Sequence, residues 1–278
     1  MAATGGNTRK SIKRNPLTNE ANKMSEWKIT TIKKVKLNKP VLIVGMPGIG
    51  NVGKIAADIM VDQLKAESLV SFFSFCLPNS VFVQEDNLVE LPRIEFKHKR
   101  KGNSDFLFLV GDVQPMKEED AYAFASAVLS VAVKYKCREI VTLGGIGLGE
   151  LPVSPRIFCT GNDKKFMDEF VKLGVNNKLH GVVGPIMGIS GLLLGLSKEQ
   201  KVRAASLLIE TYAHPMHIGL REAKELMGIL EKKYKLGIDM KKVESDIKKL
   251  EKGLKPLAKQ QEMLEQENMS HQDTTYIG

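Results

Sequence analysis

The sequence predicts an α/β fold: a three-layer sandwich in which helices cover both faces of a largely parallel, mixed sheet. Segments with the periodicity of strands and of helices alternate along most of the chain. Most of the strand segments are continuous apolar runs, which is typical of strands that are buried on both faces. The region between them has hairpin turns at Asp86-Asn87 and Gly102-Asn103, so it should add antiparallel strands.

The first half of the core alternates apolar runs with segments of helical periodicity. Its clearest strand is VLIVGM, which Pro47-Gly48 ends, and its clearest helix is VGKIAADIMVDQL, whose apolar residues share one stripe. In chain order, we expect a strand at 27–37, a strand at 41–46, a helix at 52–64, a strand at 69–75, short hairpin strands up to residue 104, a strand at 105–112 and a helix at 118–135.

The second half of the core continues this alternation. REIVTLGGIG is a strand that ends in glycines, and GISGLLLGL follows a glycine-rich turn as a buried helix. In order, we expect a strand at 138–147, a helix at 163–175, a strand at 179–185, a helix from 188 to 196 and an amphipathic helix at 219–234. Residues 197–211 join the last two helices and receive no assignment.

The chain changes character after residue 236, where the core domain that begins at residue 27 is expected to end. Apolar residues then recur at spacings of three and four, with charged residues between them, which indicates a heptad seam. Gly253 and Pro256 interrupt it, so we expect a short coiled coil or helical hairpin over 237–267 and a flexible tail at 268–278. The seam, which would join two helices or two copies, consists of Met240, Val243, Ile247, Leu250, Leu254 and Leu257.

Charge is distributed unevenly along the 278 residues. Residues 1–40 contain ten Lys or Arg and two Glu, so they contribute +8 of the formal net charge of +9. Residues 1–26 are therefore expected to form a disordered basic arm, and the folded domain is not expected to bind nucleic acid. Such an arm could itself contact nucleic acid, which is one of the functions to test.

The composition also bears on the compartment. No apolar run reaches the roughly 20 residues that a membrane-spanning helix needs, and the first residues lack the apolar segment of a secretory signal. The three cysteines form no C-x-x-C pair, which is typical of reduced thiols. We expect a cytoplasmic protein with no membrane partner.

The stretch GMPGIGNVGK at 45–54 matches two nucleotide-binding patterns, the G-x-G-x-x-G fingerprint and most of the P-loop. At the last P-loop position, however, Ile55 lacks the hydroxyl group that would hold Mg²⁺. The dinucleotide pattern needs an acidic residue after the next strand to bind ribose, and Cys76 follows 69–75 instead. The glycines are therefore expected to allow tight turns and close helix packing.

A ligand crevice is the alternative interpretation of these glycines. Glycine-rich corners are expected after four strands, at 45–53, 111–112, 144–149 and 184–191. Ligands of open α/β sheets bind at the carboxyl ends of the strands, where backbone N–H groups can approach a phosphate or carboxylate. The candidate crevice residues are Gly48, Gly50, Asp112, Gly145 and Ser190.

No catalytic, metal or cofactor set is predicted. His214 and His217 flank a proline, and no Asp, Glu or Cys completes a metal set with them. Ser190 does not fit the G-x-S-x-G pattern of a nucleophile elbow, because the following glycine comes one position too soon.

Four motifs, in order and at this spacing, resemble the archaeal members of the proteasome assembly chaperone family, homologues of the second eukaryotic assembly chaperone. The segment REAKELMGILEKKYKLGIDM and the charged helical tail after it resemble the family as well, so the match covers residues 39–250. The motifs are GMPGIGNVGKIAADIM, GDVQP, TLGGIG and GPIMGISGLLLGL.

The resemblance implies a phosphorylase/hydrolase-like sandwich without catalysis, a homo-oligomer with projecting C-terminal helices, and α subunits of the proteasome core particle as partners. Some members of the family dock on the α-ring through a tail of a hydrophobic residue, a tyrosine and any third residue. The corresponding residues here are Tyr276, Ile277 and Gly278, so Ile277 occupies the tyrosine position.

The leading hypothesis is thus a non-catalytic, oligomeric proteasome assembly chaperone or activator that docks through its C-terminal tail. The alternative is an enzyme or sensor that binds a nucleotide or nucleoside in the glycine-rich crevice. A third hypothesis is nucleic-acid binding through the basic arm.

Overall fold

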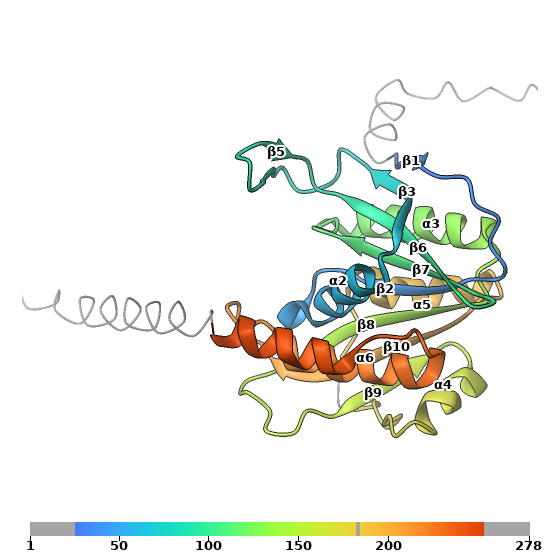
Figure 1. Cartoon of the computed structure of the whole chain (residues 1–278). Coiled ribbons are helices and arrows are strands. Elements are labelled where there is room, and N and C mark those ends of the chain that lie inside the picture. Colours follow the sequence, from blue (N-terminus) through green and yellow to red (C-terminus); the bar gives the residue numbers. More distant parts are fainter. Residues whose placement is uncertain (1–25, 182–183, 253–278) are drawn as a thin grey trace, which may run out of the picture.

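The centre of the molecule is an eight-stranded mixed sheet in the order β1-β3-β6-β7-β2-β8-β10-β9 (Figure 1). The computed structural model describes residues 26–181 and 184–252. Strands β7, β2, β8 and β10 run parallel in the middle, and the others join them antiparallel. The strands are β1 (Lys28–Thr31), β2 (Val41–Gly45), β3 (Glu67–Phe73), β6 (Ile94–Lys101), β7 (Ser104–Gly111), β8 (Glu139–Leu148), β9 (Ile157–Gly161) and β10 (Arg203–Tyr212).

Helices cover both faces of this sheet, which confirms the predicted three-layer sandwich. Side chains alternate along β2, so that Val41 and Ile43 enter one apolar core while Leu42 and Val44 enter the other. The first core lies under α2 (Val52–Leu64), α4 (Lys164–Val171) and α6 (Leu220–Tyr234). The second lies under α3 (Glu118–Lys134) and α5 (Gly188–Glu199).

A separate two-stranded hairpin projects from the body, formed by β4 (Phe82–Val83) and β5 (Val89–Glu90). Its turn at Asp86-Asn87 is the predicted one, and Asn87 takes the left-handed φ of 63°. The second predicted turn also holds, since Gly102 joins β6 to β7 with φ of 56°.

The second half of the sheet differs from the prediction. The strand expected at 179–185 is wrong, because the described residues of that segment lie in no strand. The apolar residues of 179–185 suggested a strand, but the strand that pairs with β8 is β10, which lies in the unassigned segment after α5. Strand β9 was missed as well, since its sequence IFCTG neither alternates nor forms a continuous apolar run.

The helix that carries the described part of the predicted heptad seam, Met240 to Leu250, packs on its own domain. Residues 240–252 are helical and lie beside α6, to which Arg221–Glu251 and Lys224–Glu244 ion pairs join them. Val243 and Ile247 are buried in the core below.

This helix also extends the packed core beyond the expected boundary at residue 236. Met240 packs against the core and is partly buried, whereas Leu250 is 52% exposed. Leu254, Leu257 and the tail lie outside the described residues, as does the basic arm up to residue 25. Over the described residues, no helix is long and apolar enough to cross a membrane.

Candidate functional site

The carboxyl edge of the sheet brings the predicted glycine motif onto two other strands. After β2, a short 3₁₀ turn, η1 (Ile49–Asn51), leads into α2 and lies across β8 and β10. A Cβ atom on Gly145 would lie 2.6 Å from the Ile49 carbonyl oxygen, and one on Gly50 would lie 3.0 Å from Thr211 Oγ1. Gly50 also has φ of 61°, which favours glycine. The turn therefore packs directly against Gly145 of β8 and Thr211 of β10.

Close backbone packing continues into the first turn of α2. A Cβ atom on Gly53 would lie 2.4 Å from the Leu143 carbonyl oxygen, and one on Gly45 would lie 2.3 Å from the Gly53 carbonyl oxygen. In contrast, a Cβ atom on Gly48 would meet nothing within 4 Å. Gly45 and Gly53 are thus required by packing, and Gly48 is not.

The segment between β10 and α6 closes over the turn. The Gly219 N–H donates to the Gly50 carbonyl at 2.8 Å. Below this contact, the buried carboxylate of Glu222 accepts a hydrogen bond from Thr211 Oγ1 at 2.7 Å and lies 2.8 Å from His217 Nε2. This buried carboxylate is therefore paired internally.

Lys54, the would-be P-loop lysine, is held by two carboxylates. Its Nζ lies 2.9 Å from Asp58 Oδ2, one helical turn later, and 3.8 Å from Asp112 Oδ1. Burial raises the pKa of Asp58, and the Lys54 ion pair opposes that rise only in part. Asp112 also accepts a hydrogen bond from the Arg93 backbone N–H at 2.9 Å, so it joins the end of β7 to β6.

Ser190 belongs to a different part of the molecule from the other candidates. It lies in α5, on the face of the sheet opposite to α2, and its carbonyl accepts a hydrogen bond from Thr142 Oγ1 at 3.5 Å. Gln114 connects the two faces: its amide N–H donates to the Pro47 carbonyl, and its Oε1 accepts from the Ile189 N–H at 3.3 Å.

The five predicted crevice residues therefore do not form one site. Gly50 and Gly145 meet through η1, and Asp112 reaches the same corner only through Lys54. Gly48 faces open space, and Ser190 is on the far face. Two predicted corners also differ: 144–148 is the second half of β8 itself, and no described strand ends directly before 184–191.

The polar groups described at this edge are used for packing and for internal pairing. The part of the chain that the structure describes contains no group of three His, Cys, Asp or Glu that could hold a metal ion. Gln114, Thr211 and Glu222 were not predicted from the sequence. Gln114 could have been found as the polar residue of the GDVQP motif, whereas nothing in the sequence indicates the Thr211–Glu222 pair.

The sequence and the fold resemble those of known proteins. The profile of the PAC2 family matches residues 42–258. The chain belongs to the PAC2 family. This confirms the resemblance drawn from the four motifs. An uncharacterized protein of Methanocaldococcus jannaschii is 28% identical over 249 residues, which are 87% of this chain and 93% of that one.

Two solved structures from Pyrococcus furiosus share the architecture of this PAC2 protein. One is PbaB, an archaeal proteasome activator, with a TM-score of 0.76 and 27% identity over 84% of this chain and 100% of that one. The other is PbaA, an archaeal homologue of proteasome-assembly chaperone, with a TM-score of 0.69 and 21% identity over 90% and 99%. The second likeness is one of fold alone.

Proposed function

We propose that this chain is a non-catalytic chaperone or activator of the proteasome that works in the cytoplasm as a homo-oligomer. In this proposal it docks on the α subunits of the core particle through its C-terminal residues. The observation that carries the proposal is the likeness to PbaB, which spans all of that activator and 84% of this chain. Membership of the PAC2 family supports it.

The geometry of the glycine-rich edge supports a role without catalysis. The carbonyl of Ile49, the side chain of Thr211 and the carbonyl of Leu143 lie where side chains would be if the glycines had them. Lys54 is paired with Asp58 rather than placed beside a hydroxyl residue that could hold Mg²⁺. A nucleotide would have to displace these contacts.

The proposed docking residues, Tyr276, Ile277 and Gly278, lie outside the described residues. Their chemistry suits capture in a pocket that binds the terminal carboxylate and one or two side chains. A single tail of this kind buries few groups and should bind weakly. Several tails on one oligomer can raise the avidity by roughly 10²–10⁴-fold if the geometry permits simultaneous binding.

A pulldown with proteasome α-rings tests the proposal. The parent protein should bind, a variant that lacks residues 276–278 should not, and Ile277→Tyr should bind more tightly because it restores the family's tyrosine. Ile277→Ala is the matched control, since it alters the same position without adding a phenolic hydroxyl. Equal binding by all four proteins would show that this tail is not the docking element.

A further inference from the structure

Lysine repeatedly takes a backbone conformation that lysine does not favour. Positive φ outside glycine is typical of asparagine, aspartate and histidine, and a helix that ends in this conformation usually ends with glycine. In the described chain, the non-glycine residues with positive φ are two asparagines and five lysines. The lysines are Lys39, Lys65, Lys136, Lys201 and Lys235, and all are exposed. When one residue type recurs in a costly conformation, its side chain is the feature to explain.

These lysines lie at the amino edge of the sheet. Lys65, Lys136 and Lys201 follow α2, α3 and α5 and precede β3, β8 and β10, which all begin at this edge. Lys39 precedes β2 in the same way. Lys235 follows α6, and Gly237 beside it lies against Nζ of exposed Lys101, in the turn between β6 and β7. We call the lysine face the set of Lys39, Lys65, Lys101, Lys136, Lys201 and Lys235.

The strand register shows that the turns of the lysine face adjoin. Val41 pairs with Glu139, and Glu139 pairs with Arg203, at the starts of β2, β8 and β10. The turns that carry Lys39, Lys136 and Lys201 are therefore neighbours across three adjacent strands.

Contacts between turns extend this continuity to the rest of the edge. The Arg138 N–H donates to the Pro40 carbonyl at 3.0 Å, which joins the turn before β8 to the turn before β2. Arg100 Nη2 donates to the Lys36 carbonyl at 3.0 Å, which joins the β6–β7 turn to the segment after β1. The Lys33–Glu67 ion pair joins that segment to the turn of Lys65.

Helix dipoles do not account for these positions. A basic residue near a helix C-terminus complements the partial negative charge there, and the last turn of the helix is sufficient for this. Helices α3, α5 and α6 already have basic residues in that turn, among them Lys134, Lys198 and Lys232. Lys39 follows no helix. The lysine face thus adds charge beyond what the helix ends use.

The carboxylates of the amino edge mostly pair with other groups. No described residue forms an ion pair with the lysine face. The ion-paired carboxylates of this edge are Glu67 with Lys33, Asp105 with Arg100, Glu139 with Arg138 and Arg203, and Glu169 with Arg203 and Lys233. Those that accept backbone N–H groups are Asp163, Glu231 and Asp239.

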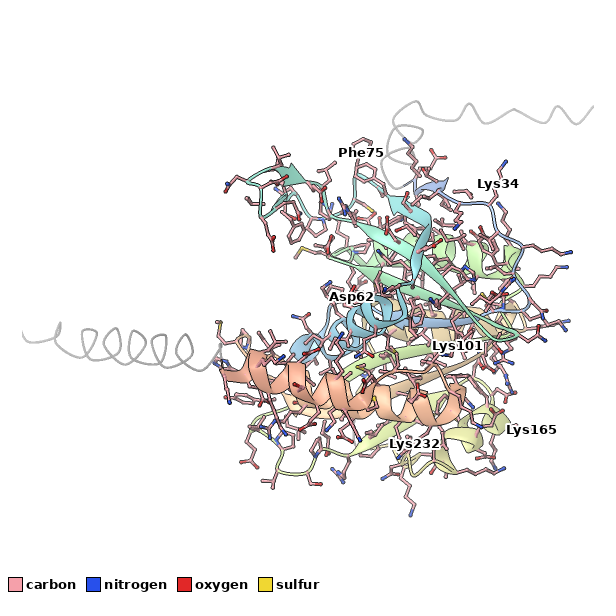
Figure 2. All side chains as sticks on the ribbon, viewed as in Figure 1. Lys34, Asp62, Phe75, Lys101, Lys165 and Lys232 are labelled. Atoms are coloured by element: carbon pink, nitrogen blue, oxygen red, sulfur yellow. The ribbon has the colours of Figure 1, made fainter. Side chains whose placement is uncertain are left out.

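Three carboxylates of this edge have no such partner among the described residues. They are exposed Asp62 and Glu199 and partly exposed Asp168. Against them stand the lysine face and further exposed lysines around it, such as Lys34 and Lys165 (Figure 2). The amino edge therefore keeps an excess of positive charge. The near-neutral sum for the residues after 40, from which the folded domain was not expected to bind nucleic acid, does not show this separation.

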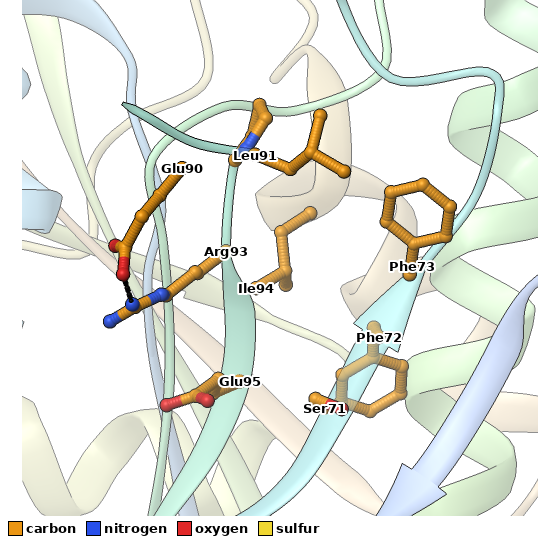
Figure 3. Close-up of a pocket in the computed structure, with 9 residues that line it drawn as sticks. Ser71, Phe72, Phe73, Glu90, Leu91, Arg93, Ile94 and Glu95 are labelled. Carbon is orange, nitrogen blue, oxygen red and sulfur yellow. Dashed lines mark ion pairs between the residues drawn. The ribbon is translucent and has the colours of Figure 1, made fainter. Parts of the chain in front are cut away.

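The carboxyl edge has the opposite character. A hollow of about 370 Å³ lies beside the ends of β3 and the start of β6, lined by residues that include Phe73 and Leu91 (Figure 3). Its cation, Arg93, is paired with Glu90. Most large apolar side chains that are exposed lie in the β4–β5 hairpin and in the segments after β7, β8 and β10.

This separation indicates the chemistry of a partner for the lysine face. The cores of protein–protein interfaces are depleted of lysine and enriched in aromatic residues, methionine and arginine. Interfaces with nucleic acid are more polar and much more positively charged. At the amino edge the exposed large apolar residues are Ile32 and Val133, so its composition is that of the second class.

The dimensions and the aromatic residues favour a duplex. Eight strands spaced about 4.8 Å apart give an edge roughly 34 Å long, about one turn of duplex. Sites for single strands stack bases on exposed aromatic rings. The aromatic side chains near this edge, Tyr135, Phe166 and Tyr234, are partly or fully buried. We propose that the lysine face binds the phosphate backbone of a nucleic-acid duplex, independently of its sequence.

The side chains available also explain the lack of sequence preference. Arginine reads base edges through a planar fork, whereas lysine acts on phosphate as a point charge. The arginines of this edge, Arg100, Arg138 and Arg203, are all paired with carboxylates. The unpaired cations are lysines, which suit phosphate contacts.

A matched pair of full-length variants tests the proposal by anisotropy of a labelled duplex of roughly two turns, as DNA and as RNA. The face variant changes Lys65, Lys136, Lys201 and Lys235 to glycine, which adopts positive φ without strain. The control changes Arg9, Lys10, Lys13 and Arg14 of the basic segment to glutamine, which removes the same charge. Thermal melting should show that both variants are folded.

Salt dependence gives the decisive measurement. Six phosphate contacts should make the parent's affinity fall on the order of 10³-fold between about 50 and 200 mM salt. The face variant should bind at least about tenfold more weakly at about 50 mM salt, with a log–log salt slope smaller by roughly 4. The control should keep the parent's slope, and duplexes of different sequence should bind alike. Binding of either the DNA or the RNA duplex in this manner supports the proposal.

Several outcomes overturn the proposal. These are a parent that binds no duplex, a face variant that keeps the parent's affinity and slope, and equal losses in the face variant and the control. If the glycine variant does not fold, the same four lysines changed to glutamine remove the same charges and are judged by the same criteria.

The proposed function is tested separately, because the proteasome role does not depend on the lysine face. Capture of α-rings by the face variant at the parent's level leaves that role standing, whatever the duplex result. Loss of α-ring capture in the face variant, with no duplex binding by the parent, would assign the lysine face to an acidic protein surface and overturn the nucleic-acid proposal.

Discussion

The two ends of β7 each carry an aspartate, and the two aspartates have opposite surroundings. Asp105, at the amino end, is 1% exposed and accepts hydrogen bonds from the Asn38 N–H and from Arg100, with His98 Nε2 2.8 Å away. Asp112, just after the carboxyl end, is about one-third exposed and is bound by the Arg93 N–H and, more loosely, Lys54.

The two edges of the sheet can be compared in the same way. The amino edge is joined by charge, since Arg203 there bridges the buried Glu139 to Glu169, and it is lined by lysines such as Lys34 and Lys165 (Figure 2). The carboxyl edge combines close glycine backbone packing with paired carboxylates, Glu210 with Arg156 and Glu222 with His217. It also leaves large apolar side chains exposed in the β4–β5 hairpin and in the segments after β7, β8 and β10. Ion pairs of buried carboxylates therefore occur at both edges, and the glycine-rich turn lies at the carboxyl edge.

Replacing the two aspartates should give the largest contrast. Asp105→Ala leaves His98 and the Asn38 N–H without their buried acceptor, and a buried group that loses its hydrogen bond costs about 1–3 kcal/mol. Asp112→Ala removes an acceptor that is about one-third exposed, and should cost about 1 kcal/mol or less. Urea unfolding of both variants measures the difference.

Asp105→Asn serves as the control, because it keeps the shape of the side chain and removes the charge. It should lie between the parent and Asp105→Ala. Equal losses for Asp105→Ala and Asp112→Ala would contradict the view that the buried aspartate stabilises the fold more than the exposed one.

Two glycine substitutions test the carboxyl edge in the same way. Gly53→Ala places a Cβ atom 2.4 Å from a backbone carbonyl that cannot move independently, so it should destabilise by about 1–3 kcal/mol. Gly48→Ala meets nothing within 4 Å and has the extended φ of −173°, so its stability should match that of the parent. Thermal melting distinguishes the two; similar melting temperatures would show that backbone packing does not require Gly53.

Elements in the N-terminal half of the chain were predicted well because each has a strong local pattern. VLIV, DFLFLVG and the α2 stripe all lie where they were expected. The prediction of a strand at 179–185 was wrong because residues of high β-propensity do not show whether a neighbouring strand is available for pairing. Only the structure shows that β10 holds that place.

The candidate site was predicted less well, for a related reason. The glycine motifs led to the expectation of an open crevice, whereas backbone from η1 lies against Gly145 and Ser190 is on the other face of the sheet. The seam was also judged from spacing alone, and spacing cannot tell whether Val243 and Ile247 face another copy or the chain's own core. Exposure of both faces of the β4–β5 hairpin leaves no periodic pattern to detect.

Acid pH should reveal the charge of the amino edge. Burial alone would raise the pKa of Asp105, but hydrogen bonds from Arg100, the Asn38 N–H and His98 outweigh it and lower the pKa from 3.8 to about 2. A carboxyl group with a lowered folded-state pKa contributes stability above its unfolded pKa, and loses it as the pH falls through the folded pKa. The parent should therefore lose stability between about pH 4 and pH 2.

Asp105→Asn isolates this share of the acid sensitivity, because it has no carboxyl group to protonate at that position. Its free energy of unfolding should fall less steeply than the parent's over the same pH range. Identical pH profiles for the parent and Asp105→Asn would mean that other carboxylates account for the acid response.

The smallest effect is expected at Lys54, where the carboxyl edge most resembles a nucleotide site. Its ion pairs with Asp58 and Asp112 are partly exposed, and such pairs contribute up to about 1 kcal/mol. Lys54→Ala should therefore lower the free energy of unfolding by less than about 1 kcal/mol. A double-mutant cycle with Asp58→Ala should give a coupling free energy of the same size, because the Lys54–Asp58 pair at 2.9 Å is the closer of the two ion pairs.

Neither the parent nor Lys54→Ala should hydrolyse ATP or GTP, since Ile55 offers no hydroxyl for Mg²⁺ and the backbone at the start of α2 already contacts β8. Magnesium-dependent turnover by the parent that disappears in Lys54→Ala would make this edge an active site instead of a packed corner.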